Sequence, residues 1–308
     1  MHKIWSRQVK PLFSYYGGKQ RMAPNLLPLL PRHTVYVEPF CGGAALFWNK
    51  HQRTNGSNYR EVLNDANAQL VNLYRVMQDE ATARALIHRL VFTPYARAEY
   101  QKALEIYKNG TDCPIEAAWA FYVNANMSFA KKLNAGFGVG LVSQNQANSW
   151  ANQLTQLSSQ FERLNGVHIE CNDALAIIKQ WDSPQTLFYC DPPYPGTDQG
   201  HYSGYTHDDF LKLVDALDQC EGSFLLSNYD QPGIPNHWER YEFKATMSAV
   251  GNTGHGANAR RQKLTRENTE RTEVVWRMDR SHNMRDDLLR LFPNDGHQLN
   301  LLDLTNAC

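Results

Sequence analysis

The sequence predicts an α/β fold in which one sheet is interrupted by a mostly helical insert. Short apolar segments alternate with helical ones in residues 1–67 and again in residues 167–308. Between them, residues 68–166 have the periodicity of helices and no segment typical of a strand. We therefore interpret residues 1–67 and 167–308 as the two parts of one sheet domain, and residues 68–166 as a separate helical domain.

The individual elements follow from apolar runs and turn residues along the chain. In the first part, strands are expected at residues 35–37 and 61–63, with a helix at 44–49 between them. In the insert, helical periodicity runs through residues 70–77, 95–107, 115–129 and 150–164, with a polar segment at 131–148. In the last part, strands are expected at 167–169, 187–189, 224–227 and 272–276, helices at 174–181 and 208–217, and a polar loop at 250–270.

The bulk composition excludes several classes of protein. The 31 basic and 31 acidic residues balance, so a nucleic-acid partner has to be recognised by local basic clusters. The 6 cysteines include no C-x-x-C pair, which argues against a disulfide framework and a zinc site. No segment approaches the roughly 18 apolar residues of a membrane span. We expect a soluble, cytoplasmic protein.

Three loops that follow predicted strands carry unusual residues. In open α/β sheets, ligands bind beyond the carboxyl ends of the strands, so these loops are the place to look for a site. The first is residues 38–43, E-P-F-C-G-G, whose glycines allow close approach of a ligand and whose following helix offers free amides. The second is Asn64 and Asp65, and the third is Asp191, Pro192, Pro193 and Tyr194.

The D-P-P-Y loop has the groups needed to methylate an amino group on a base. Such an amine is a poor nucleophile because its lone pair is delocalised, so acceptors must hold both N–H groups and turn the lone pair outward. The Asp191 carboxylate and a backbone carbonyl at Pro192 can do this, and two prolines stiffen the loop. Tyr194 can stack on an extruded base. The alternative is an ordinary turn, since Asp and Pro are common turn formers.

Five stretches, taken together, resemble the Dam-type, or alpha-class, DNA adenine methyltransferases. They are residues 15–19 (Y-Y-G-G-K), 37–43, 63–65, 191–194 and 226–229 (L-S-N-Y). The resemblance implies a Rossmann-like class I methyltransferase sheet with an inserted target-recognition domain. It also implies S-adenosyl-L-methionine as cofactor and N6 of a flipped-out adenine in double-stranded DNA as the acceptor.

The same resemblance implies roles for residues outside the D-P-P-Y loop. Tyr15 and Lys19 would lie at the amino-acid end of the cofactor, Asp65 at the ribose hydroxyls and Asp173 at the cofactor's adenine. An acid after the second strand is also suited to ribose on general grounds. For Asp65 and Asp173 a helix N-cap is the other interpretation, and for Asp65 both roles can coexist. The remaining cofactor-binding residues are expected in the same loops: Gly18, Glu38, Pro39, Phe40, Gly42 and Asp191.

Contacts with DNA are expected from two polar, basic clusters. Basic side chains bind phosphates, and Asn and Arg also read base edges. A solvated charged surface is the alternative for each residue, and nearby acids such as Glu273 dilute the later cluster. Residues 124–132 follow the family's Asn-Arg-x-Gly-Phe-Asn-Gly-like stretch only loosely, so recognition of GATC is not implied. The clusters are Lys131, Lys132 and Asn134, and then Arg260, Arg261, Lys263 and Arg266.

Two other functions remain open at the level of sequence. Methylation of the cytosine N4 amine needs the same geometry, although Asp191 together with Tyr194 favours adenine. A DNA-binding regulator that has lost catalysis is the second, although the intact loop and Lys19 argue against it. The chemistry requires no metal. We expect a monomer, because an enzyme that modifies one strand per visit needs no two-fold symmetry.

Overall fold

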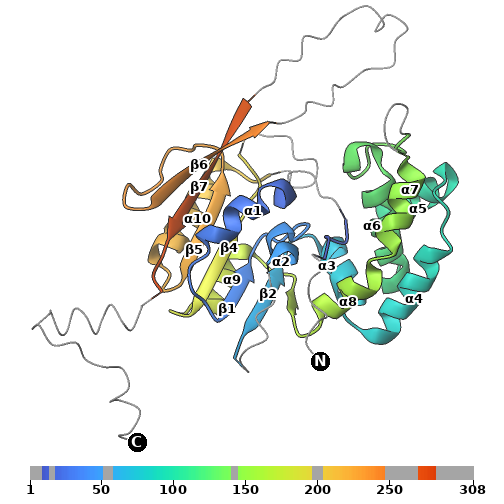
Figure 1. Cartoon of the computed structure of the whole chain (residues 1–308), viewed down its shortest axis with the longest axis horizontal. Coiled ribbons are helices and arrows are strands. Elements are labelled where there is room, and N and C mark those ends of the chain that lie inside the picture. The colour runs from blue at the N-terminus through green and yellow to red at the C-terminus, as the bar shows by residue number, and fades with distance from the viewer. Residues whose placement is uncertain are drawn as a thin grey trace, which may run out of the picture.

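The computed structural model describes residues 9–13, 18–50, 58–139, 145–195, 204–246 and 270–281. Its centre is a seven-stranded sheet with the order β3-β2-β1-β4-β5-β7-β6 (Figure 1). Strands β1 to β5 run parallel, and β7 is antiparallel to both of its neighbours. The strands are β1 Val35–Glu38, β2 Arg60–Asn64, β3 His168–Glu170, β4 Thr186–Cys190, β5 Ser223–Asn228, β6 Glu239–Thr246 and β7 Glu270–Met278.

The strand order reverses at β1, which makes the edge beyond β1 and β4 the expected ligand site. Strand β1 pairs with β2 on one side and with β4 on the other, so that Val37 is opposite both Val62 and Phe188. The chain leads outward from β1 to β2 and β3, and then crosses back to β4. The predicted α/β fold is confirmed, and the loops after β1, β2 and β4 meet at one edge of the sheet.

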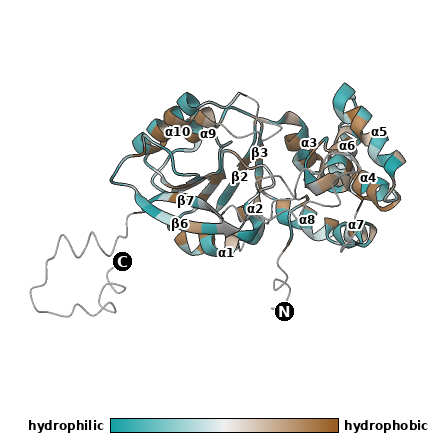
Figure 2. Ribbon diagram, turned by 90° about the horizontal axis from the view of Figure 1, so that it is seen from above, coloured by the Kyte–Doolittle hydropathy of each residue, from teal (hydrophilic) through white to brown (hydrophobic). Residues whose placement is uncertain are grey.

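Helices cover both faces of the sheet, because alternate side chains of its buried strands point to opposite sides. In β4, Phe188 belongs to one apolar cluster with α9 and α10, whereas Leu187 and Tyr189 belong to the other, with α1 and α2. Figure 2 shows α1 and α2 on the opposite side of the sheet from α9 and α10. The elements are η1 Lys19–Arg21, α1 Ala23–Leu26, η2 Leu27–Leu29, α2 Ala45–Asn49, α9 Ala174–Trp181 and α10 His207–Gln219.

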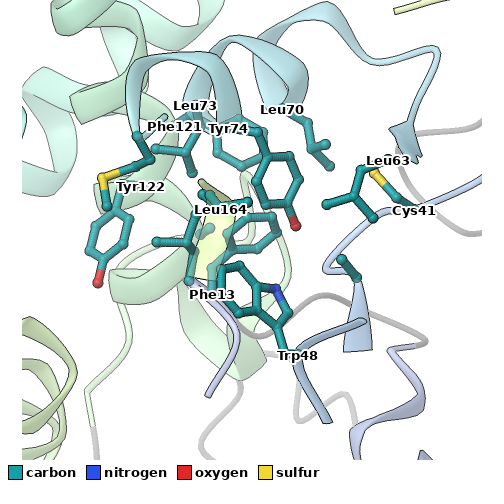
Figure 3. Close-up of a cluster of buried hydrophobic side chains, with 14 of the residues drawn as sticks. Phe13, Cys41, Trp48, Leu63, Leu70, Leu73, Tyr74, Phe121, Tyr122 and Leu164 are labelled. Atoms are coloured by element: carbon teal, nitrogen blue, oxygen red, sulfur yellow. The ribbon is translucent and has the colours of Figure 1, made fainter. Parts of the chain in front are cut away.

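The segment between β2 and β3 is a helical lobe beside the sheet (Figure 2). Helix α6 is its centre, since the residues from Ala118 to Met127 are all buried, and α3, α4, α5 and α7 pack against it. Figure 3 shows Tyr74 and Phe121 from this lobe packed with Phe13 and Trp48. The elements are α3 Ala68–Val76, α4 Glu80–Val91, α5 Arg97–Asn109, α6 Pro114–Met127, η3 Phe129–Lys131, α7 Gln146–Leu154 and α8 Leu157–Leu164.

The structure differs from the sequence-based elements at several places, and α1, with the 3-10 helices η1 and η2 on either side of it, was not predicted. The helix expected at residues 150–164 is two helices, because α7 ends at Leu154 and α8 begins at Leu157. Helix α4 was not anticipated. Neither was strand β6, whose alternating polar residues lie at the edge of the sheet and pair only with β7. No helix in the described part of the chain has the length and apolar character of a membrane span.

Candidate active site

Two stretches from opposite ends of the chain meet at the carboxyl end of β4. Asp191 directly follows β4, and its Oδ1 lies 2.8 Å from Nζ of Lys19, which is 172 residues away in the sequence. The hydroxyl of Tyr194 lies 3.3 Å from the same oxygen. Both contacts fall on Oδ1, and the described residues include no partner for Oδ2. One oxygen of the carboxylate is therefore held by the protein.

Lys19 is buried between two carboxylates. Its Nζ lies 2.5 Å from the Tyr194 hydroxyl and 3.2 Å from Oε1 of Glu273, and 4.7 Å from the centre of the Tyr194 ring. Burial alone would lower the pKa of Lys19, but Asp191 and Glu273 raise it above its ordinary value. Lys19 is therefore an ammonium ion at neutral pH, and it balances one of the two acids.

Tyr194 is buried, and both its hydroxyl and its ring are engaged. The hydroxyl donates a short hydrogen bond to Oε1 of Glu273. The ring packs edge-on against Tyr229, which follows β5, with centroids 4.6 Å apart. Burial, followed by the charges of Asp191 and Glu273, raises the pKa of the Tyr194 hydroxyl. Tyr194 is therefore a neutral phenol that connects Lys19 with both acids, and its stacking on a base stays a prediction.

Two residues of this site were given no role from the sequence, although Asn228 lies in the stretch 226–229 that carries the family resemblance. Glu273 was grouped with acids that dilute a basic cluster, yet it is a buried member of β7. An acid beside the apolar run Val274, Val275, Trp276 was the available signal. Asn228 ends β5, and its Oδ1 accepts from the Tyr229 amide at 2.7 Å. Its buried Nδ2 has no partner among the described residues, as expected of a donor that meets a ligand.

The loop after β1, residues 38–43, is called the glycine loop here; it is tightly turned, and Glu38 at its start is fixed by hydrogen bonds. Oε1 of Glu38 accepts from the Tyr36 hydroxyl and from the amide of Phe47 in α2, both at 2.8 Å. Gly42 and Ala44 have φ values of 46° and 50°, in the left-handed region. The hydroxyl of Tyr74 in α3 donates to the Gly42 carbonyl at 2.9 Å. The glycine loop is thus fixed by β1, α2 and the helical lobe together.

The loop after β2 is joined to the glycine loop through Asp65. Its Oδ2 accepts from the Gly42 amide and its Oδ1 from the Asn67 amide, each at 2.9 Å. The N-cap of α3 is Asn67, so the interpretation of Asp65 as an N-cap was wrong: the helix begins at Ala68, two residues later than that role requires. Asp65 instead connects the loops after β1 and β2 through these two hydrogen bonds, and its contact with ribose stays a prediction.

Asp173 and Asn64 complete this edge of the sheet. Asp173 is the N-cap of α9 and accepts from the amides of Leu175 and Ala176, which confirms the N-cap interpretation. Asn64 donates to the carbonyls of Pro39 and Asn172 at 2.9 Å and 3.0 Å, and so connects the loops after β1, β2 and β3. Pro39 and Phe40 lie in the first of these loops. The contact of Asp173 with a cofactor stays a prediction.

The expected DNA-binding residues of the insert lie in a compact loop after α6. The Lys131 ammonium donates to the Asn126 carbonyl, and burial lowers the pKa of Lys131. Asn134 is held by Asn124 through two hydrogen bonds of 3.0 Å and 3.1 Å. Both Lys131 and Asn134 have left-handed φ values, of 56° and 63°. Lys132 follows in the same loop. Tyr15 and the cluster Arg260, Arg261, Lys263 and Arg266 lie outside the described residues.

The buried Glu38 gives the site a measurable pH dependence. Burial raises the pKa of Glu38 from 4.5 to about 8, against the hydrogen bonds from Tyr36 and Phe47. The folded protein therefore holds this proton more tightly than the unfolded chain, so the stability contributed by Glu38 is full below pH 4.5 and is lost as pH rises to about 8. Between those values we expect the free energy of unfolding to fall by about 1 kcal/mol per pH unit relative to Glu38→Gln.

Denaturant unfolding of both proteins from pH 5 to 8 measures this difference. Glu38→Gln is the control because it keeps an oxygen that can accept from Tyr36 and Phe47 but does not titrate. Parallel stability curves for the two proteins would contradict the assignment of a raised pKa to Glu38.

Comparison with known proteins identifies the family. The family model of the D12 class N6 adenine-specific DNA methyltransferases matches residues 15–246. The chain belongs to this family. It is a DNA methyltransferase specific for N6 of adenine, as the resemblance implied, and its methyl donor is of the S-adenosylmethionine type. The match spans strands β1 to β6, the helical lobe and the D-P-P-Y loop, and it ends before β7.

Curated relatives agree with the family. The Type II methyltransferase M1.LlaDCHI of Lactococcus lactis subsp. cremoris is 26% identical over 245 residues, which cover 73% of this chain and 82% of the relative. The retron Ec67 DNA adenine methylase of Escherichia coli is 24% identical and covers 80% of this chain and 88% of its own. A DNA adenine methylase of Vibrio cholerae is 25% identical, covering 73% of this chain and 83% of its own.

Proposed function

We propose that this DNA adenine methyltransferase transfers the methyl group of S-adenosyl-L-methionine to a flipped-out adenine, with Asp191 as the acceptor that orients the amine. The observation that carries the proposal is the asymmetric environment of Asp191. Oδ1 accepts from Lys19 at 2.8 Å and has the Tyr194 hydroxyl 3.3 Å away, and Oδ2 is left for the substrate. A carboxylate held on one oxygen is already positioned before the base enters, which lowers the cost of reaching the reactive geometry.

The charge of the site fits a sulfonium donor. Lys19 carries one positive charge against the two carboxylates of Asp191 and Glu273, so this buried cluster is net negative. Glu38, with its pKa raised to about 8, adds little charge at neutral pH. Bound S-adenosyl-L-methionine supplies a methyl group on a positively charged sulfur, which is what makes the methyl group electrophilic. A net negative cluster attracts such a cation and attracts the neutral thioether product less.

The loops after β1 and β2, where the strand order reverses, are suited to bind the amino-acid, ribose and adenine parts of this cofactor. The left-handed turn at Gly42 brings backbone close to the ligand edge, and Asp65 lies beside it at the end of β2. We propose that Gly18, Lys19 and Tyr15 meet the amino-acid end of the cofactor, Asp65 the ribose, and Asp173 the adenine, with Glu38, Pro39, Phe40 and Gly42 forming the wall between them. These assignments follow the usual placement of nucleotide ligands beyond the carboxyl ends of parallel strands.

Asp191 and the Pro192 carbonyl would orient the amine for the transfer step. One N–H of the adenine amine donates to Asp191 Oδ2, and the other to the carbonyl of Pro192, so that the lone pair points away from the ring plane. The nitrogen would take the methyl group as the carbon–sulfur bond of the donor breaks, and Asp191 would accept the proton that the amine releases. Pro193 stiffens the loop through its fixed φ. Asn228 Nδ2 is a buried donor available to a ring nitrogen of the base.

Double-stranded DNA would lie across the helical lobe and this edge of the sheet. Lys131, Lys132 and Asn134 of the insert are proposed to contact DNA, from a loop that Lys131 and Asn134 also shape through Asn126 and Asn124. The cluster Arg260, Arg261, Lys263 and Arg266 is proposed as a second phosphate contact from sequence alone. We propose that the protein acts in the cytoplasm as a monomer.

The direct test is incubation of the purified protein with methyl-labelled S-adenosyl-L-methionine and unmethylated genomic DNA. We expect labelled N6-methyladenine in one short sequence context, measured by nucleoside analysis and single-molecule mapping. Label in N4-methylcytosine would instead support the cytosine alternative. Cofactor binding without any transfer to DNA would contradict the proposed function.

A further inference from the structure

Glu273 reaches the catalytic edge from a strand late in the chain. In the β5–β7 pairing, Asn228 is opposite Val274, so Glu273 lies just beyond the last residue of β5. On its other side it pairs with Phe243 of β6. This register places its carboxylate at the hydroxyl of Tyr194 and 3.2 Å from Lys19 Nζ. The antiparallel strand thus delivers an acid to a site that is otherwise built from loops after parallel strands.

The Tyr194 hydroxyl has one proton and two possible carboxylate acceptors. Oε1 of Glu273 is much the closer, and Oδ1 of Asp191 lies 3.3 Å away. The proton therefore goes to Glu273, and Lys19 is the main donor to Asp191. Without Glu273, Tyr194 would donate to Asp191, and Lys19 would pair with Asp191 alone. Both changes withdraw negative charge from the Asp191 carboxylate, whose Oδ2 is the proposed acceptor of the amine hydrogen.

Glu273 also decides the net charge of the buried cluster. Lys19 and Asp191 alone form a neutral pair, and the ionised Glu273 carboxylate adds a negative charge that no described cation balances within the cluster. Burial raises the pKa of Glu273 above its ordinary value, while Lys19 and the hydrogen bond from Tyr194 favour the ionised form. Its side chain is only 7% exposed, so water screens this charge weakly. Other titratable groups that face Glu273 are the phenols of Tyr189 and Tyr194, which are neutral because burial raises their pKa.

We propose that Glu273 is a positioning residue for methyl transfer: it holds the Tyr194 hydroxyl and shares Lys19 with Asp191, which leaves Asp191 available to the amine and the site negatively charged toward the sulfonium donor. The inference rests on the proposed function, because it takes Asp191 as the acceptor and a sulfonium as the donor. It adds a role in distinguishing the charged donor from its neutral product, S-adenosylhomocysteine.

Two substitutions separate the effect of the Glu273 charge from the effect of its side-chain length. Glu273→Gln keeps the shape and an oxygen that can accept from Tyr194, but removes the charge. We expect its preference for S-adenosyl-L-methionine over S-adenosylhomocysteine to fall roughly tenfold, and its kcat to fall about 10- to 100-fold. Glu273→Asp keeps the charge but is one methylene shorter. We expect it to keep the binding preference and to lose about 10-fold in kcat.

Calorimetric titration of each protein with the two compounds measures the preference, and single-turnover transfer to DNA measures the rate. Glu242→Gln is the matched control: it is the same change on the exposed side of the neighbouring strand β6, and both readouts should stay at the wild-type level. Thermal unfolding verifies that each variant is folded. A general loss of structure would weaken binding of both compounds alike and would leave their ratio unchanged.

A folded Glu273→Gln with wild-type kcat and wild-type preference would overturn the inference. If Glu273→Gln does not fold, Glu273→Asp decides, and wild-type kcat in that variant would overturn it. Failure of the proposed function has a different signature: the wild-type protein would transfer no methyl group to adenine, whereas the dependence of the binding preference on Glu273 could still be measured.

Discussion

Replacing Asp191 with asparagine should lower kcat for methyl transfer by about 1,000-fold while the protein stays folded and binds DNA. The neutral amide is a weaker acceptor than the carboxylate, and its NH₂ group repels the amine hydrogens of the base. The side chain of Asp191 is 19% exposed, and Lys19 keeps its second partner, Glu273, so no buried charge is left unpaired. Asp191→Ala should abolish transfer, because no acceptor remains.

Single-turnover transfer and DNA binding measured on the same preparations test this expectation. Asp215→Asn is a suitable control, because Asp215 is exposed on α10 and accepts only from Gln219 in the described structure. The control should transfer methyl groups at the wild-type rate. Wild-type activity in either Asp191 variant would show that another group orients the amine.

Replacing Glu61 with glutamine should lower the free energy of unfolding by about 3–5 kcal/mol, since it leaves two buried cations without their shared acid. The Glu61 carboxylate accepts from Arg163 through both oxygens, at 2.6 Å and 2.8 Å, and from Lys50 at 2.7 Å. All three side chains are less than a tenth exposed. Burial raises the pKa of Glu61, but Arg163 and Lys50 together bring it below its ordinary value.

This ion cluster joins the helical lobe to the sheet. Arg163 lies in α8, Glu61 in β2 and Lys50 directly after α2, and Arg163 also donates to the Phe47 carbonyl at 3.1 Å. Loss of Glu61 should therefore increase hydrogen exchange in α2 and α8 in addition to lowering global stability.

Denaturant unfolding and hydrogen exchange measure the two effects of Glu61→Gln. The exposed pair Glu80 and Arg84 provides the control, because screening by water makes Glu80→Gln nearly neutral. If Glu61→Gln unfolds no more easily than Glu80→Gln, the buried cluster does not hold the two parts together.

Features that depend on neighbouring residues could be predicted from the sequence, whereas features that depend on residues far apart in the chain could not. The alternation of strands and helices could be predicted, because side-chain periodicity and turn residues are local properties of the chain. Helix α9 was predicted with its observed bounds. The loop with Asp191 was identified because the chemical properties of its residue types can be recognised from the sequence directly after a predicted strand. Strand β6 was missed because an edge strand keeps many polar residues, and its only partner is β7.

The sequence by itself thus determined the fold class, the family and the position of the D-P-P-Y loop after a buried strand. Only the tertiary structure decided which charged groups surround that loop. Lys19 meets Asp191 across 172 residues, and Glu273 meets Tyr194 across 79. Such contacts depend on strand order and on the antiparallel register of β7, which are properties of the assembled sheet and have no periodic signature in the chain.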